Sequence, residues 1–166
     1  GEHNAALAAS EEVLALHRAR DPVSDDVGMG LNDVGIILHT LGRHDEAEAH
    51  YQEALTLARR LGDADGVAIY TNNLAELAVA RGRPAEAEAL AQKALTLAEP
   101  IGRRTLIADC CTNLALALTA QGRGAEGRPY AERAVNILAA LRSPNLSEAQ
   151  AALAACAAPP ASPRPG

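Results

Sequence analysis

The fold of this chain is decided by a stretch of seventeen residues that occurs twice. Residues 42–58 read GRHDEAEAHYQEALTLA and residues 82–98 read GRPAEAEALAQKALTLA, so 12 of 17 positions are identical at a shift of 40. A third Gly-Arg pair follows at the same spacing, at residues 122–123, where the rest of the copy is weaker. A fixed period of this length is typical of a protein built from stacked structural repeats.

Each copy predicts two helices joined by a tight turn. The residues before the first quoted stretch carry an apolar stripe at helical spacing, formed by Leu31, Val34, Gly35 and Leu38. The glycine that begins each copy suits the left-handed conformation that ends a helix, and the second helix is expected to begin near residue 45, 84 or 125. One such hairpin cannot bury its own apolar face, so neighbouring hairpins must stack.

The spacing of these residues resembles the tetratricopeptide repeat (TPR). The family's small residue in the first helix, its turn glycine and its second-helix pattern are matched at Gly35, Gly42, Ala47, Tyr51 and residues 54–55. The period of 40 exceeds the standard ~34 residues and is similar to the longer variety found in kinesin light chains and bacterial regulators. The resemblance implies an all-α, right-handed superhelix of about three and a half helix-turn-helix repeats plus a C-terminal capping helix.

The same alignment predicts how the chain is divided. It opens with a second helix that lacks its first, which indicates either a fragment of a longer protein or a native half-repeat cap. Ser147 is expected to be the N-cap of the last helix. The expected segments are a solenoid over residues 1–157, made of a half-repeat (3–20), repeats at about 25–62, 63–102 and 103–142 and a capping helix (146–157), and a disordered Pro-rich tail (158–166).

Composition excludes several other classes of protein. The 166 residues carry a net charge of −6, include three Tyr and contain neither Trp nor Phe, which disfavours a β-rich fold and a nucleic-acid-binding surface. No apolar run approaches the ~20 residues of a membrane span, and the first residues do not read as a signal segment. We therefore expect no membrane contact and a cytoplasmic location. Cys111 falls on an apolar stripe and is expected to be a small core residue.

No motif predicts an enzyme, a metal site or a bound cofactor. Residues 122–127 match the G-x-G-x-x-G pattern of dinucleotide-binding folds, but a helix rather than a strand is expected before them, and Gly122 is the repeat-turn glycine. His39, His44 and His50 include no pair three or four residues apart on one helix, which disfavours a metal site.

Charged side chains recur with the repeat. The glutamates at 46, 48, 86 and 88 are interpreted as a solvated helix face. The arginines at 43, 83 and 123 form a column along one rim, which either solvates the turns or contacts an anion or acidic partner.

The resemblance places the binding surface on the concave side, on the face of each first helix opposite its packing stripe. A side-chain amide both donates and accepts hydrogen bonds, so asparagines at successive repeats suit an extended peptide backbone. An alternative is that Asn72 or Asn73 caps or cross-links neighbouring helices. The candidate peptide-binding residues are Asn32, Asp33, His39, Asn72, Asn73, Glu76, Asp109 and Asn113; Ile36, Ile69, Val79, Thr112, Leu116 and Thr119 are expected on the same face.

These observations predict a non-catalytic protein- or peptide-binding module. The candidate face carries acidic side chains and no Lys or Arg, so we expect a neutral or basic peptide partner rather than the acidic tails that some relatives bind. The resemblance further implies a sensor or scaffold part of a larger bacterial regulatory protein. The alternative is a structural element that forms a homo-oligomer through its N-terminal half-repeat.

Overall fold

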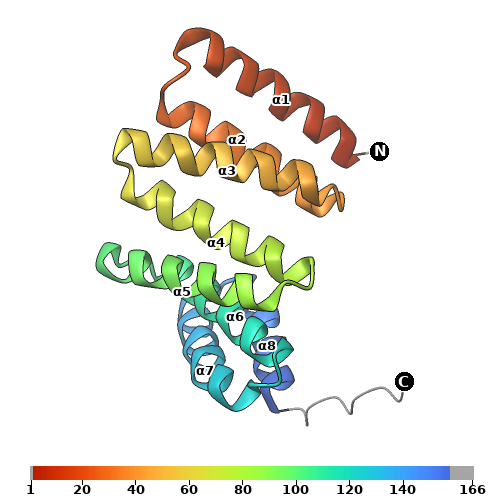
Figure 1. The fold of residues 1–166 in the computed structure, drawn as a ribbon, viewed down its shortest axis with the longest axis vertical. Helices are drawn as coiled ribbons and strands as arrows, with labels where there is room; N and C mark the ends of the chain where they lie inside the picture. Colours follow the sequence, from red (N-terminus) through yellow and green to blue (C-terminus); the bar gives the residue numbers. More distant parts are fainter. Residues whose placement is uncertain (1, 158–166) are drawn as a thin grey trace.

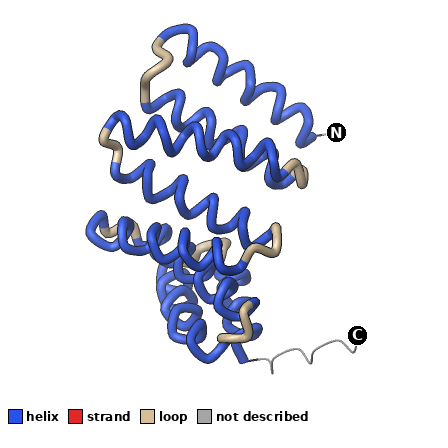
Figure 2. Tube along the Cα trace, viewed as in Figure 1, coloured by secondary structure: helices blue, strands red, loops and turns tan. Residues whose placement is uncertain are grey.

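The computed structural model describes residues 2–157, which form eight α-helices and no strand (Figure 2). The disordered Pro-rich tail predicted for residues 158–166 lies outside the described part of the chain. The helices are α1 (Glu2–Arg20), α2 (Asp25–Thr40), α3 (His44–Leu61), α4 (Ala64–Ala80), α5 (Pro84–Ile101), α6 (Arg104–Ala120), α7 (Gly124–Leu141) and α8 (Leu146–Ala157).

The turns within the hairpins are closed by glycines in the left-handed conformation. Gly42, Gly82 and Gly122 have φ angles of 74°, 64° and 76°. After the turn, the Arg83 N–H donates to the Ala78 carbonyl at 2.9 Å, which satisfies one of the carbonyls left free at the end of α4. Other residue types are strained at such φ angles, which explains why the Gly-Arg pair recurs with the period of the sequence.

Small residues let the two helices of a hairpin pack closely. A Cβ atom on Gly35 would lie 2.5 Å from Cε1 of Tyr51, and one on Gly127 would lie 2.9 Å from the Ala115 carbonyl oxygen. Tyr51 is 1% exposed, so its ring occupies the space that a larger residue at position 35 would need. The packing role predicted for Gly35 is therefore physical contact with the ring of the next helix.

The helices of residues 2–157 form two layers, and helices of the same layer contact one another in only one of them. Among the described residues, α2, α4, α6 and α8 contact one another in succession, whereas α1, α3, α5 and α7 contact only helices of the other layer. We call the first set the inner helices and the second set the outer helices. The stack is therefore curved, with the inner helices on its concave face, and runs from α1 at one end to α7 and α8 at the other (Figure 1). The predicted all-α helical-repeat solenoid is confirmed.

Two details differ from the sequence-based expectation or refine it. The last helix begins at Leu146, so Ser147 lies within its first turn and does not precede it as an N-cap.

In the G-x-G-x-x-G stretch, Gly122 ends the turn after α6, and a Cβ on Gly124 would lie 2.8 Å from the Cys156 carbonyl oxygen. Gly124 and Gly127 thus permit close helix packing, and the residue before Gly122 belongs to a helical hairpin and not to a strand.

Candidate functional site

Asparagines on neighbouring inner helices are hydrogen-bonded to each other. Asn73 Nδ2 donates to Asn32 Oδ1 at 2.6 Å, which joins α4 to α2. Asn113 Nδ2 donates to Asn72 Oδ1 at 3.1 Å, which joins α6 to α4. Asn72 and Asn113 are each 4% exposed. The cross-linking alternative therefore describes these contacts correctly, and the pairs contribute to the stacking of the repeats.

Each pair nevertheless retains unused hydrogen-bonding atoms. Among the described residues, Nδ2 of Asn72 and Oδ1 of Asn113 have no further hydrogen-bond partner, and the same holds for Nδ2 of Asn32 and Oδ1 of Asn73. If both amides of a pair were rotated, the pair would still present one donor group and one acceptor. Cross-linking and ligand binding are thus compatible in the same side chains.

A pocket of about 260 Å³ opens between α4, α6 and the start of α8. We call it the acidic pocket, because three of its side chains are carboxylic acids and none is basic. Burial, the nearby Glu148 and Asp109 together raise the pKa of Glu76 to about 7. Burial raises the pKa of Asp109, and the charge of Glu148 raises it further. The Asn145 amide opposes this shift, because it donates a hydrogen bond to the Asp109 carboxylate at 3.3 Å. The lining residues are Asn72, Asn73, Glu76, Asp109, Thr112, Asn113, Asn145 and Glu148.

His39 is a basic group that lies beside Glu76, one of the residues that line this pocket. Its Nδ1 lies 3.8 Å from Glu76 Oε1. Burial, together with the neighbouring His44 ring at 5.4 Å between centroids, lowers the pKa of His39. The imidazole therefore supplies little positive charge at neutral pH, and the carboxylates of the acidic pocket remain without a cationic partner.

A second pocket, of about 420 Å³, lies near the amino ends of α2 and α4. It combines four aspartates with apolar side chains, and its single arginine, Arg103, is paired with Asp65. Met29 is 55% exposed at this site. We call it the N-terminal pocket; its lining residues are Asp25, Met29, Asn32, Asp33, Asp63, Asp65, Gly66, Ile69, Tyr70 and Arg103.

The structure thus distributes the candidate residues over one face of the inner helices. Five of them line the acidic pocket, Asn32 and Asp33 line the N-terminal pocket, and His39 lies beside Glu76. Thr119 differs, because its hydroxyl is 3.2 Å from the Cys156 sulfur and it lies at the contact between α6 and α8.

Two residues of the acidic pocket, Asn145 and Glu148, were missed by the sequence reasoning. Both belong to the turn before α8 and its first helical turn, a segment that was interpreted only as a cap. The period of 40 residues does not predict their positions. Asn145 bonds to Asp109, which lies 36 residues earlier in the chain. The available signal was that a helix covering the third repeat must lie beside α6 on the concave face.

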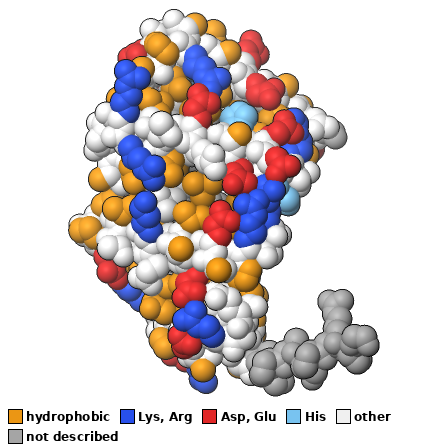
Figure 3. Space-filling model, in the orientation of Figure 1, with side chains coloured by type: hydrophobic (Ala, Val, Ile, Leu, Met, Phe, Trp, Pro, Cys, Tyr) orange, Lys and Arg blue, Asp and Glu red, His pale blue; other side chains and the backbone are white. Residues whose placement is uncertain are grey.

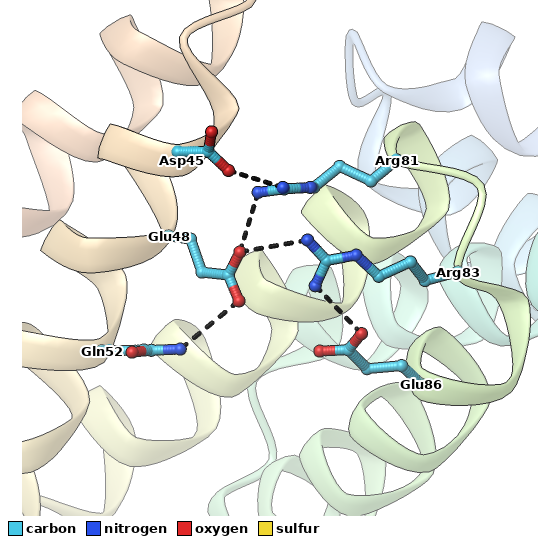
Figure 4. A network of polar contacts seen from close by, with 6 residues as sticks. All are labelled: Asp45, Glu48, Gln52, Arg81, Arg83 and Glu86. Atoms are coloured by element: carbon cyan, nitrogen blue, oxygen red, sulfur yellow. Dashed lines mark hydrogen bonds and ion pairs between the residues drawn. The ribbon is translucent and has the colours of Figure 1, made fainter.

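Of the rim arginines, Arg83 forms an ion pair between repeats together with Arg81 (Figure 4), whereas Arg43 pairs with Glu46 of its own repeat. Arg81 bonds to Asp45 at 2.5 Å and to Glu48 at 2.8 Å, and Arg83 bonds to Glu48 at 3.3 Å and to Glu86 at 3.2 Å. We call these five residues the rim cluster. Oppositely charged side chains lie side by side along the right-hand edge of the view in Figure 3.

The next repeat has a similar arrangement, in which Glu88 accepts from Gln121 at 2.7 Å and from Arg123 at 2.8 Å. Glu48 and Glu88 are therefore bridges between repeats, and their interpretation as a solvated face was wrong. The side-chain contacts also mean that Arg83 and Arg123 are already neutralised by neighbouring glutamates.

Cys111 is fully buried, in agreement with its predicted core position, and burial raises its pKa to about 11. Within residues 2–157, no group of three or more His, Cys, Asp or Glu side chains is placed to hold a metal ion. No described helix is both long and apolar enough to cross a membrane.

Comparison with known proteins gives one consistent result. Residues 26–99 and residues 107–144 match two family models, each described as tetratricopeptide repeat. No curated protein gave a match.

Solved structures of repeat proteins are similar to this fold. BtubC (BKLC) from P. vanneervenii is 19% identical with a TM-score of 0.70, over 92% of this chain and 63% of that chain. A kinesin light chain-like protein of Podosopora anserina with nearly identical TPR-like repeats is 19% identical with a TM-score of 0.72, over 94% of this chain and 77% of that chain. This chain therefore spans less than two thirds of BtubC.

Proposed function

Because the chain belongs to the tetratricopeptide repeat family, in its longer-repeat form, and TPR repeats are generally protein-interaction modules, we propose that its concave face binds an extended polypeptide segment. The TPR fold is typically non-catalytic, and the proposed module performs no reaction. The observation that carries the proposal is the pair of asparagine cross-links, each of which keeps one free donor group and one free acceptor on this face.

The free amide atoms fit a peptide backbone. A peptide unit presents one N–H and one C=O, so an Asn pair with one donor and one acceptor can bond to it irrespective of its side chains. Packed helices lie about 8–10 Å apart, and an extended chain advances about 3.3 Å per residue. Successive Asn pairs therefore correspond to positions about three residues apart in an extended ligand.

The charge of the face selects for a neutral or basic segment. Asp33, Glu76 and Asp109 are joined on this side by Glu148 and by the aspartates of the N-terminal pocket. An acidic ligand would add charge repulsion to an already crowded set of carboxylates, whereas a basic ligand would be attracted during encounter.

The proposed setting is a larger bacterial regulatory protein, in which this array serves as sensor or scaffold. This part of the proposal rests on the resemblance to the longer-repeat arrays of such regulators.

Selection from a library of displayed random nonamer peptides tests the proposal. We expect selected peptides to bind the wild-type chain and to lose binding to the double variant Asn73→Ala, Asn113→Ala. The matched control is Asn136→Ala, which removes an exposed amide from α7 on the outer layer. Circular dichroism verifies that all variants retain their helices. Equal binding to the wild type and the groove variant would place the binding surface elsewhere.

A second candidate function is self-association through α1. Positions 47, 51 and 54 of α3 are buried against α2, and the positions equivalent to them in α1, at a shift of 41, are Ala6, Ser10 and Val13. Val13 is 48% exposed and Leu16 is 65% exposed. This uncovered face could contact a second copy. Light scattering should then show a mass that rises with concentration and that falls to the monomer in Val13→Glu; a monomer at every concentration rejects it.

A further inference from the structure

The acidic pocket holds three carboxylates on a concave surface; Asp109 is half-buried, and the Glu76 side chain is 50% exposed. Among the described residues, Glu76, Asp109 and Glu148 form no ion pair with Lys or Arg, although the chain pairs most of its arginines elsewhere. Glu148 lies in the first turn of α8, where the helix dipole favours a negative charge. Like charges brought together in this way destabilise each other unless a cation is supplied.

The amides of the same pocket are an independent sign of a ligand. Asn72 and Asn113 are more than nine-tenths buried as residues and bond to each other, and each lines the pocket with one amide atom that has no partner among residues 2–157. These two atoms are accessible, because the described side-chain N and O atoms that are both buried and unpartnered are His44 Nδ1 and Asp65 Oδ1. The pocket therefore presents carboxylate oxygens, an amide oxygen and an amide nitrogen toward the same space.

We infer that the acidic pocket binds the guanidinium group of an arginine side chain carried by the polypeptide segment on the concave face. This inference rests on the proposed function, because the arginine belongs to that segment. Its guanidinium would lie among Glu76, Asp109 and Glu148, and its backbone would bond to the Asn72–Asn113 pair. One end of the pocket then recognises the charge of the ligand and the other recognises its main chain.

The chemistry of the pocket favours arginine over lysine and over a metal ion. A guanidinium has five N–H donors spread over a plane, which matches acceptors contributed by three separate helices. An ammonium is a compact charge with three donors and keeps its water more strongly. The described acids are not grouped in the way that a metal ion requires.

Nuclear magnetic resonance titration of the full chain with Nα-acetyl-arginine N-methylamide tests the inference. This probe carries the guanidinium and one peptide unit on each side of Cα. We expect it to shift the side-chain amide resonances of Asn72 and Asn113. The citrulline analogue, which has the same shape and no charge, should bind about tenfold more weakly, as should the arginine probe to the double variant Glu76→Gln, Glu148→Gln.

The matched control is the double variant Glu11→Gln, Glu12→Gln, which removes two exposed acids of α1 and changes the net charge by the same amount. Its affinity for the arginine probe should equal that of the wild type. Three results would overturn the inference: equal binding of the arginine and citrulline probes, unchanged binding by the pocket variant, or tighter binding of the lysine analogue.

Failure of this inference is distinguishable from failure of the proposed function. Displayed peptides that require Asn73 and Asn113 but carry no shared arginine would contradict the arginine site and leave groove binding intact. If no peptide depends on those asparagines, the proposed function itself fails.

Discussion

The rim cluster and the acidic pocket contain the same number of acids and treat them in opposite ways. In the rim cluster, Asp45, Glu48 and Glu86 are bonded to two arginines that join neighbouring repeats. In the acidic pocket, three acids face one another with no arginine or lysine among the described residues to pair them. Charge at the rim is used to hold the stack together, whereas charge in the pocket is left available to a ligand.

This contrast predicts which polar side chains the fold depends on. Removing an acid from the rim should weaken the stack, and removing one from the pocket should not. The buried amides beneath the pocket are a third case, because they are already hydrogen-bonded to each other and contribute to both roles.

The largest effect on stability is expected from Asn113→Ala. The substitution removes the hydrogen-bond partner of the Asn72 amide, and Asn72 is 4% exposed. Leaving a buried polar group without its hydrogen bond lowers the free energy of unfolding by about 1–3 kcal/mol. Urea denaturation measures the change. Asn136→Ala, on the exposed side of α7, should change the free energy of unfolding by less than about 0.5 kcal/mol. An equal effect of the two variants would show that the Asn pair does not support the stack.

Glu48→Gln and Glu76→Gln compare the two acidic regions directly. Glu48 is 23% exposed and bonds to both Arg81 and Arg83, so its replacement should cost roughly 1 kcal/mol. Glu76→Gln should leave stability unchanged or raise it at pH 8, because it relieves repulsion from Asp109 and Glu148. Thermal unfolding of both variants checks this. A larger loss from Glu76→Gln than from Glu48→Gln would contradict the contrast.

Glu76 should also make the free energy of unfolding depend on pH, and this effect should be smaller than the preceding ones. Its pKa is about 7 in the folded chain and 4.5 as the reference value, so the folded state holds the proton more tightly between these values. The contribution of this group to stability is therefore greatest below pH 4.5 and falls as the pH rises through 7.

The titratable groups that interact with Glu76 are His39 from α2, Tyr51 from α3, Asp109 from α6 and Glu148 from α8. Because all four remain in Glu76→Gln, the difference between that variant and the wild type reports Glu76 together with its coupling to them. We expect the wild type to lose stability relative to the variant between pH 5 and pH 8 in thermal unfolding. A difference that is constant with pH would refute the assignment.

Salt should produce the smallest effect. Added NaCl screens attraction at the rim and repulsion in the pocket, so both differences from the wild type, for Glu48→Gln and for Glu76→Gln, should shrink by a few tenths of a kcal/mol. Denaturation at low and high ionic strength measures this. If only one difference shrinks, the corresponding region alone is governed by charge.

The fold was predictable because its determinants repeat with the sequence. Gly42, Gly82 and Gly122 mark the turn within each hairpin. The ring of Tyr51 fills the space that Gly35 leaves free on the facing helix. The face that carries the candidate residues follows from the same period, since residues 41 apart, such as Asn32 and Asn73, lie on adjacent inner helices.

The details of the candidate site required the structure. Asn145 and Glu148 reach the acidic pocket through the path of the turn before α8, which does not follow the repeat. Glu48 and Arg81 look like ordinary surface charges in the sequence, because nothing in a helical period states which polar side chain meets the next repeat. Whether an asparagine cross-links or stays free also depends on distances between helices.

The placement of the thiols gives the chain a built-in reporter. Cys110, Cys111 and Cys156 are all buried, and all lie in α6 or α8 of a chain that has no other cysteine. Burial raises the pKa of Cys110 to about 12 and that of Cys111 to about 11, so at these two positions an alkylating reagent meets neither an accessible sulfur nor a thiolate until this part opens. The rate of alkylation therefore records the opening of the α6–α8 end alone, and it can show whether that end unravels before the α1 end does.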